Sequence, residues 1–254
     1  MTARERLGDV VLKAAVLVGV IAVWWFLANR STSPYYPSPG DVLPTVWNDW
    51  LTDTAAWTDS IIPSVVRIAY GFFLAAAGSI ALGMAIGRSR VLSELLEPSI
   101  HFLRAIPPPA LLGVSLVVFG IGDVQKVALI AFGVAPPILL NTIDGARSVE
   151  ELQLETAQAY RISRWDRIVR VIFPAAAPKV FAGLRVSISL AVILMVISEL
   201  VAAPDGVGSR INGAARDFDY VDLWAGLVVL ALLGIVLNAL LTVVERSTLR
   251  WRQP

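Results

Sequence analysis

The side chains that most often carry catalytic or metal chemistry are scarce in this chain. Its 254 residues include one histidine, His101, and no cysteine, so a zinc site or an iron–sulfur cluster, which needs several such ligands, is not expected. The sequence contains neither a G-x-S-x-G nucleophile elbow nor a G-x-x-x-x-G-K-S/T phosphate-binding loop. We therefore expect no cofactor on this chain, and no nucleophile–base set supports an intramembrane enzyme.

Charged residues within apolar stretches are the stronger functional candidates. The chain is 56% hydrophobic and 16% charged, with a mean hydropathy of +0.70, whereas about 25% of the residues of soluble domains are charged. Arg67, Arg104 and Arg185 lie near the ends of apolar runs, where they either extend to lipid headgroups, the simpler interpretation, or line a pathway. Glu199 is expected either to contact water or to take part in a gate. The net charge of +1 gives no support for a nucleic-acid partner.

The elements that must position these residues are apolar helices. Six runs of about 20 residues are each long enough to cross roughly 30 Å of hydrocarbon. They cover residues 10–28, 61–86, 99–121, 124–143, 180–201 and 223–244. The predicted fold class is therefore an all-α integral membrane protein with six transmembrane helices.

Prolines are expected to cut the third and fourth runs, at Pro107, Pro108 and Pro109 and again at Pro136 and Pro137. An alternative for these two runs is one long buried hairpin. The first proline cluster frees carbonyl groups that lipid cannot satisfy, so it should face protein or an aqueous cavity.

The sequence leaves open what the first proline cluster does. Broken helices often border substrate sites in transporters, so a gate and a kink that only shapes packing both fit. Asn141, near the end of the fourth run, either hydrogen-bonds another helix or lines the pathway.

The orientation follows from the lysine and arginine residues, which are in excess in cytoplasmic loops. With the N-terminus inside, 14 of the 21 basic residues are cytoplasmic. They are Arg4, Arg6, Lys13, Arg88, Arg90, the six basic residues within 147–179, Arg246, Arg250 and Arg252. Both termini are therefore predicted to be cytoplasmic.

Two long segments fall on the external side in this topology. Residues 29–60 contain an amphipathic stretch whose apolar side we expect to anchor in the membrane interface rather than to dock an external partner. That side comprises Val42, Val46, Trp47 and Trp50. Residues 202–222, rich in Gly and Asp, predict turns.

Residues 148–173, hereafter the knob, form the largest predicted cytoplasmic loop. Ser148 and Glu151 have the spacing of a capping box, in which the serine hydroxyl accepts from the backbone N–H three residues on. Ser163 and Asp166 repeat that spacing. The knob is therefore expected to contain two capped helices.

The two predicted knob helices cover residues 149–160 and 164–173, and Pro174 is expected to end the second because proline lacks an N–H. Both helices are amphipathic. Such a pair either lies on the anionic inner leaflet or inserts into a groove of a partner, and the residues alone favour neither interpretation.

The knob resembles the EAA loop of ABC importer permeases, whose pattern is Glu-Ala-Ala, three residues, Gly, nine residues, Ile, one residue, Leu-Pro. Glu155, Ala157 and Pro174 match their positions in that pattern. Arg161 stands where the pattern has glycine, which makes a left-handed turn there costlier or different in shape. The other departures are Thr156, Val171 and Phe173, in place of alanine, isoleucine and leucine.

The resemblance extends over residues 61–245 and is strongest to permeases for sulfonates, taurine and nitrate. The blocks that carry it are YPSPGDV (36–42), LRAIPPPALL (103–112), FGIGDVQK (119–126), PPILLNT (136–142) and SELVAA (198–203). It implies a type I ABC importer permease fold in a prokaryotic plasma membrane. Residues 1–60 then form the N-terminal helix and external loop, 61–245 the permease domain and 246–254 a cytoplasmic tail.

The resemblance also implies partners. A homodimer of the permease would bind two cytoplasmic ATPase subunits, which hold ATP and Mg²⁺, and an external solute-binding protein would deliver the cargo. The first knob helix would be the coupling helix. The residues then expected at the ATPase contact or in its loop are Glu155, Ala157, Arg161, Ser163, Trp165 and Pro174.

A channel or an ion-driven carrier without an ATPase is the alternative. It would be expected to contain several intramembrane carboxylates that relay ions or protons, and Glu199 alone is available.

Overall fold

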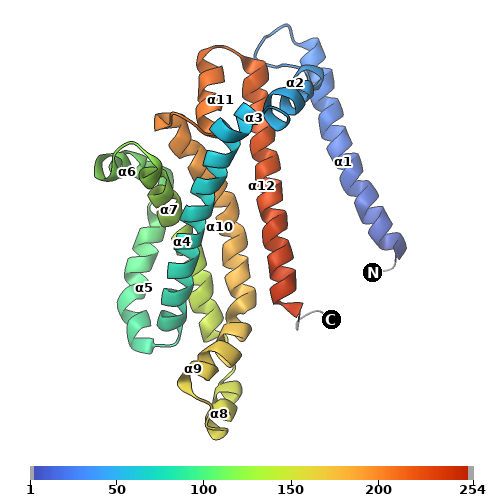
Figure 1. Cartoon of the computed structure of the whole chain (residues 1–254). Helices are drawn as coiled ribbons and strands as arrows, with labels where there is room; N and C mark the ends of the chain where they lie inside the picture. The colour runs from blue at the N-terminus through green and yellow to red at the C-terminus, as the bar shows by residue number, and fades with distance from the viewer. Residues whose placement is uncertain (1–2, 251–254) are drawn as a thin grey trace.

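The computed structural model describes residues 3–250, which form helices joined by short loops, with no strand in that range (Figure 1). The elements in chain order are α1 (Ala3–Arg30), α2 (Pro39–Thr45), η1 (Val46–Leu51), α3 (Thr54–Ala56), η2 (Trp57–Ile61), α4 (Ile62–Gly87), α5 (Arg90–Ala105), η3 (Pro108–Leu111), α6 (Leu112–Phe119), α7 (Asp123–Arg147), α8 (Glu151–Ala159), α9 (Arg164–Arg167), η4 (Ile168–Ile172), α10 (Phe173–Ala202), α11 (Val207–Arg216) and α12 (Tyr220–Thr248). The segment η3 is a 3-10 turn, and η1, η2 and η4 are π-helical.

Four continuous helical stretches of the described chain are long and apolar enough to cross a membrane. They are Thr54–Gly87, Asp123–Arg147, Arg164–Val201 and Tyr220–Thr248. A fifth candidate is α5 together with η3 and α6, which are bent by 84° relative to each other. The first predicted span lies within α1, whose described apolar part is Val18–Arg30.

Helices α4, α7 and α10 form the centre of the bundle. Glycines on α4 allow close contact with α7, because a Cβ at Gly71 would lie 2.7 Å from Ile130 and a Cβ at Gly83 would lie 2.7 Å from Thr142. Ile130 and Val134 of α7 are fully buried in this core. The close contact compensates for the weaker helix propensity of glycine.

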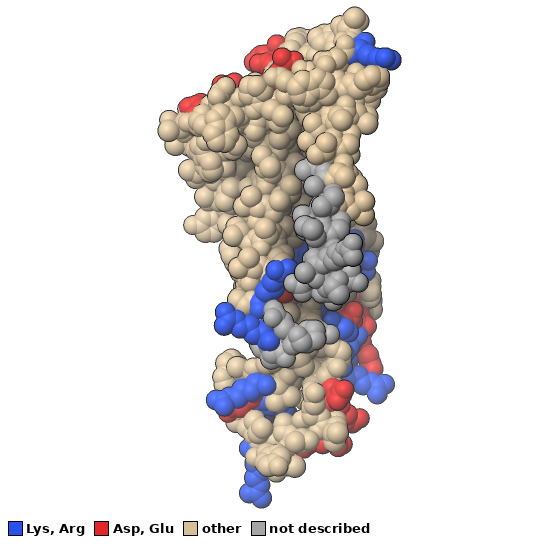
Figure 2. Space-filling view, turned by 90° about the vertical axis from the view of Figure 1, so that its right-hand side faces the viewer, with Lys and Arg blue, Asp and Glu red and all other residues tan. Residues whose placement is uncertain are grey.

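The bundle has two charged ends, and the stretch between them along α4 and α12, which we call the uncharged band, carries no charge on these two helices. Helix α4 carries no charge between Arg67 and Arg88, and α12 carries none between Asp222 and Glu245. At 1.5 Å per residue these intervals measure about 30 Å, the thickness of the hydrocarbon core. On the face drawn in Figure 2, Lys and Arg gather toward the lower end, and the band above them is free of charge.

We refer to the two ends by their contents. The knob end carries α8 and α9, the loop at residues 88–90 and the last turn of α12 (bottom of Figure 1). The platform end carries α2, η1, α3, η2 and α11, which we call the platform (top of Figure 1). Arg4, Arg6, Lys13 and Arg252, four of the predicted cytoplasmic charges, lie outside the side chains that the structure describes.

The platform corrects two sequence predictions. Residues 202–222 were expected to form turns, but they contain the ten-residue helix α11. Val42, Val46 and Trp50 do not anchor in lipid, because they are at most 5% exposed and pack against α11 and α12. Trp47, by contrast, is 63% exposed.

A polar contact also holds the platform together. The indole N–H of Trp50 donates to Asp222 at 2.7 Å. Arg210 of α11 donates to both carboxylate oxygens of Asp222, at 2.8 and 3.0 Å, and lies over the Trp50 ring. Trp50 therefore ties η1 to α11 and α12.

Helix α7 continues through Pro136 and Pro137, which corrects the predicted break. Their missing N–H groups would have reached the carbonyls of Phe132 and Gly133, four residues earlier. Ser79 of α4 donates to the carbonyl of Ala135 at 3.2 Å, and Ser187 of α10 donates to that of Val134 at 3.1 Å. Neighbouring helices thus bond to α7 directly before the proline pair and hold it on both sides.

The hairpin of the third and fourth runs is not buried. Along the third run, Val117 of α6 is 87% exposed and Phe102 of α5 is 68% exposed. Helix α7 contributes to the main core, whereas α5 contributes Ile100 to a smaller cluster with Ile86 and Ile143.

Candidate functional site

The knob consists of two short helices joined by a tight turn. At the end of α8, the N–H of Ile162 donates to the carbonyl of Ala157 at 3.0 Å and the N–H of Arg161 donates to that of Gln158 at 2.8 Å. This is the Schellman pattern, whose left-handed position is usually glycine. Arg161 occupies it with φ of +53°. The turn of the EAA pattern is therefore kept, and its strain falls on an arginine.

One predicted cap of the knob is confirmed and the other is wrong. The Ser163 hydroxyl accepts from the N–H of Asp166 at 3.1 Å and starts α9. Ser148 instead ends α7, where its hydroxyl donates to the carbonyl of Gly145 at 2.9 Å. Helix α8 begins at Glu151 after Glu150, which makes no side-chain cap.

The second knob helix does not end at Pro174, as the sequence predicted. Helix α9 passes through the π-helical turn η4 into α10 without a break. Pro174 is the second residue of α10, and Pro63 has the same place in α4 directly after the π-helical turn η2. We attribute the continuity to the wider π turn, which separates the proline ring from the preceding carbonyls.

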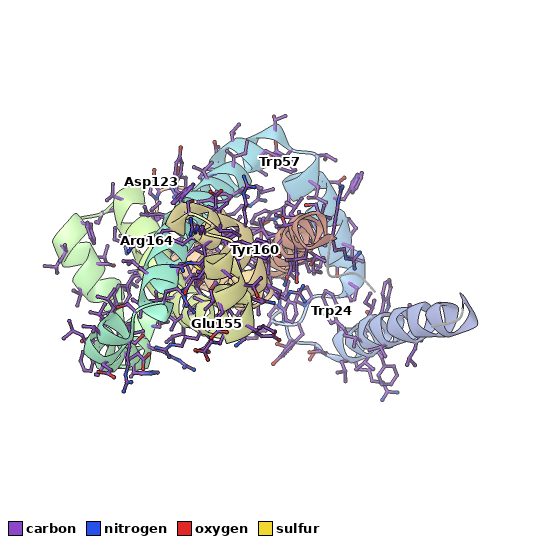
Figure 3. All side chains as sticks on the ribbon, turned by 90° about the horizontal axis from the view of Figure 1, so that it is seen from below. Trp24, Trp57, Asp123, Glu155, Tyr160 and Arg164 are labelled. Atoms are coloured by element: carbon purple, nitrogen blue, oxygen red, sulfur yellow. The ribbon has the colours of Figure 1, made fainter. Side chains whose placement is uncertain are left out.

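The knob exposes large side chains to solvent. Tyr160 is 79% exposed, Trp165 is 73% exposed and Leu152 is 70% exposed, whereas Ala157 is 3% exposed. Seen from below, Glu155, Tyr160 and Arg164 lie near the centre of the molecule, in front of the bundle (Figure 3). A large apolar and charged surface therefore projects from the knob end.

A second set of charged side chains is buried at the platform end. Arg67 of α4 donates from Nη1 to Glu199 Oε1 at 2.7 Å and from Nε to Asp123 Oδ1 at 2.7 Å. It also pairs with the Asp205 carboxylate and donates to the Asp205 carbonyl at 3.2 Å. The Arg67 and Glu199 side chains are 4% and 0% exposed. This charge cluster connects α4, α7, α10 and the loop at residues 203–206.

The charge cluster also fixes the start of α11. The Glu199 carboxylate accepts from the N–H of Gly208 at 2.9 Å, and the Ser64 hydroxyl accepts from that of Val207 at 2.9 Å. Gly206 has φ of +108°, and a Cβ there would lie 2.5 and 2.6 Å from the Glu199 carboxylate oxygens. Glu199 therefore caps α11 from a neighbouring helix, at the end where a helix dipole favours negative charge.

The helix break at the proline cluster is confirmed. Ile106 has the extended conformation expected before a proline, and η3 starts at Pro108. Pro108 packs on α7 at Gly133, where an added Cβ would lie 3.0 Å from it. The break therefore faces protein at this point. Arg104, in the last turn before the break, is exposed.

Residues 77–250 match the model of a protein family described as the inner membrane component of binding-protein-dependent transport systems. The chain belongs to this family. It is therefore a permease component of the ABC importers, as the knob and its flanking blocks led us to expect.

Named relatives agree with this assignment. The permease is 29% identical to the taurine transport system permease protein TauC of Escherichia coli, over 96% of this chain and 90% of that protein. It is 32% identical to the putative aliphatic sulfonates transport permease protein SsuC of Bacillus subtilis, over 74% of this chain and 68% of that protein. Its fold resembles that of a chain of the MetNI methionine ABC transporter, with a TM-score of 0.58 at 17% identity, over 78% and 99% of the two chains.

The candidate pathway residues of the permease do not form one cluster. Glu199 is a buried member of the charge cluster, which corrects the expectation that it contacts water. Asn141 donates to the carbonyl of Pro137 in its own helix at 2.8 Å, not to another helix. Arg185 pairs with Glu245 of α12 at the knob end.

The partnership of Arg67 with Glu199 was not predicted from the sequence, which favoured lipid headgroups for Arg67 over a place in the pathway. The signal was available: both residues lie near the external ends of their predicted spans, so they share a depth. An arginine and a glutamate at one depth in a low-dielectric layer stabilise each other by pairing.

Among the described residues, no group of three or more His, Cys, Asp or Glu side chains is placed to hold a metal ion. Three carboxylates approach one another at the charge cluster, but the guanidinium of Arg67 lies between them.

Proposed function

We propose that this permease pairs with a second copy to form the pathway of an ATP-driven importer in a prokaryotic plasma membrane. Each copy has six spans and both termini in the cytoplasm. Residues 1–60 contribute the first span and the external loop, 61–245 the permease domain and 246–254 a cytoplasmic tail. The knob is then cytoplasmic and the platform external.

One observation supports coupling to an ATPase above all others. The knob carries Leu152, Tyr160 and Trp165 beyond the uncharged band. Each of these large side chains is at least 70% exposed. Aromatic side chains of this kind dominate protein interfaces when a partner buries them. We assign α8 as the coupling helix, which fits a groove on an ATPase subunit that binds ATP and Mg²⁺.

The knob residues then have distinct roles. Glu155, Arg161 and Trp165 contact the ATPase, whereas Ala157 is buried and holds α8 to the rest of the chain. Ser163 starts α9, and Pro174 lies where the knob joins α10. Closure of the ATPase pair on ATP moves the knob, and the motion passes into α10 because no loop interrupts the helix.

The cargo is a small organic sulfonate, with nitrate as the alternative anion. Taurine and aliphatic sulfonates, named for two relatives, share a sulfonate group. An external solute-binding protein delivers the cargo. Arg104 beside the break at Pro107, Pro108 and Pro109 borders the pathway, where an exposed guanidinium attracts an anion. Asn141 and Glu199 affect the pathway through helix geometry.

The ion-driven alternative is less well supported. Its relay would use Glu199, but this carboxylate already accepts from Arg67, Ser64 and Gly208. The oxygens of this carboxylate are already used in contacts that hold α4, α10 and α11 together, which leaves the group poorly placed to serve as a relay.

Co-purification tests the assignment of the coupling helix. The double variant Glu155→Lys/Arg161→Glu should lose at least tenfold in retained ATPase, because it reverses both exposed charges of the contact. The matched control is Arg90→Glu/Glu94→Lys, which reverses an exposed ion pair of α5 at the same end of the bundle. Equal retention by the two variants contradicts the assignment.

Thiol labelling tests the orientation. The chain has no cysteine, so a single introduced thiol reports its own side of the membrane. Gln158→Cys in the knob should be labelled from the cytoplasmic side only, and Thr58→Cys in the platform from the external side only. The opposite result refutes the proposed topology and the ATPase contact together.

A further inference from the structure

A groove of about 730 Å³ lies between α4 and the segment formed by α9, η4 and the start of α10. Its floor is mostly apolar. The floor residues that matter are Ala77, Ala81 and Ala85 on α4, and Ile168, Val169 and Phe173 on the other wall. The volume lies in the range of sites that bind small molecules.

Three arginines line the same groove. They are Arg88, at the end of α4, and Arg164 and Arg167 of α9. Arg88 donates to the carbonyl of Ala146 at 3.3 Å. Within the described chain no ion pair connects any of the three to a carboxylate, whereas the neighbouring Arg170 pairs with Asp166 at 3.1 Å.

The groove has the length of one membrane leaflet. Along α4 it extends from Ala77 to Arg88, about 16 Å at the helical rise. Because α4 is free of charge from Arg67 to Arg88, the arginines lie at the edge of the uncharged band on the knob side. The groove runs from that edge to about the middle of a 30 Å core.

We infer that this groove binds one anionic phospholipid of the knob-side leaflet. An acyl chain lies along the alanine stripe of α4 against Ile168 and Phe173. The headgroup phosphate accepts hydrogen bonds from Arg164 and Arg167, whose forked guanidinium groups suit phosphate oxygens. This site requires only that the bundle spans a membrane and does not depend on the ATPase contact.

The arginines favour a lipid over a second copy of the chain as the occupant. A stripe of small residues such as Ala77, Ala81 and Ala85 also permits close packing of another helix. A helix in the groove would, however, cover the guanidinium groups of Arg164 and Arg167, and burying unpaired charge is unfavourable. An anionic headgroup supplies the missing charge.

Native mass spectrometry of the full-length permease tests this inference. The protein is equilibrated with an equimolar mixture of palmitoyl-oleoyl-phosphatidylglycerol and palmitoyl-oleoyl-phosphatidylcholine in detergent, and the retained lipids are counted. The wild-type protein should retain phosphatidylglycerol preferentially. Arg164→Gln/Arg167→Gln should reduce the preference about 30-fold, because each basic residue near an anionic headgroup contributes about five- to sixfold.

Two further variants make the result specific. Arg90→Gln/Arg170→Gln removes the same charge from arginines that are already paired, and it should keep the preference. Ala81→Phe fills the floor of the groove, and it should reduce retention of phosphatidylglycerol with all three arginines intact.

The inference is overturned by any of three results. The wild-type protein could bind both lipids equally, or the paired-arginine control could lose as much preference as Arg164→Gln/Arg167→Gln. In the third, Ala81→Phe keeps its lipid and instead dissociates the permease dimer, which would show that the groove is an interface between copies.

Discussion

At the platform end, charged and aromatic side chains are buried against one another, whereas at the knob end they point into solvent. Arg67 and Glu199 are almost fully buried as partners. Tyr160 and Trp165 are more than 70% exposed. The difference is that the charge cluster is buried within one chain, whereas the knob leaves large side chains exposed.

The same contrast holds for how each end keeps its shape. The platform is fixed by contacts between residues far apart in sequence, such as Arg67 with Glu199 and Trp50 with Asp222. The knob is fixed by local bonds, such as those of Ser163 and Arg161. Substitutions should therefore be costly at the platform and mild at the knob.

The largest effect is expected from Arg67→Met. Removing the guanidinium leaves Glu199 buried without a cation, which should lower the free energy of unfolding by about 3–5 kcal/mol. Denaturant unfolding of the protein in detergent measures this. Arg90→Met serves as the control, because its ion pair with Glu94 is exposed and contributes at most about 1 kcal/mol. Equal losses in the two variants would remove the contrast between buried and exposed charge.

A smaller loss is expected from Gly206→Ala. The positive φ and the nearby Glu199 carboxylate should together lower the free energy of unfolding by about 2–3 kcal/mol. Gly213→Ala is a matched control in α11, because a Cβ there meets nothing within 4 Å. We expect that control to be neutral or to stabilise the protein by up to about 1 kcal/mol. An unchanged free energy of unfolding in Gly206→Ala would mean that the Glu199 carboxylate does not lie in close contact with the start of α11.

The two serines of the knob should differ by about 1 kcal/mol. Ser163→Ala removes the cap of α9 and should lower local stability by about that amount. Ser148→Ala leaves the start of α8 unchanged, because Ser148 bonds within α7. Hydrogen exchange of the α8 and α9 amides measures both effects. Faster exchange of the α8 amides in Ser148→Ala would show that Ser148 caps α8, as the sequence predicted.

The smallest effect is expected from Arg161→Gly. Glycine relieves the left-handed strain at Arg161, but it also increases the conformational entropy of the unfolded chain. The free energy of unfolding should therefore rise by only about 0.5 kcal/mol. Hydrogen exchange at the Ile162 amide reports it. The ATPase should bind this variant more weakly although the knob is more stable, and unchanged binding would exclude Arg161 from the contact.

The sequence predicted local features better than contacts between distant segments. Four of the six predicted apolar runs lie in helices long enough to span a membrane, and a fifth coincides with the bent pair of α5 with η3 and α6. The structure also confirms the break before Pro108 and the cap at Ser163, and all of these features depend on neighbours in sequence. The predicted effects of Pro136 and Pro174 were wrong. Helix α7 is held between α4 and α10 at its proline pair, and a π-helical turn leads into α10 directly before Pro174.

The charge cluster was the largest omission. Arg67, Asp123, Glu199 and Asp205 come from three helices and a loop, so only a three-dimensional arrangement brings them together. Residues 202–222 were predicted to form turns because they are rich in Gly and Asp, among them Gly206 and Gly208. The structure shows that both glycines make room for Glu199.

The continuity of α9, η4 and α10 has a mechanical consequence. The helical stretch Arg164–Val201 contains 38 residues, which corresponds to about 57 Å of nearly unbroken rod. Its two ends carry Trp165 and Glu199. If the rod pivots near one end by about 10°, the other end moves about 10 Å. A small tilt imposed at Trp165 would therefore displace Glu199 and the charge cluster at the opposite end of the bundle.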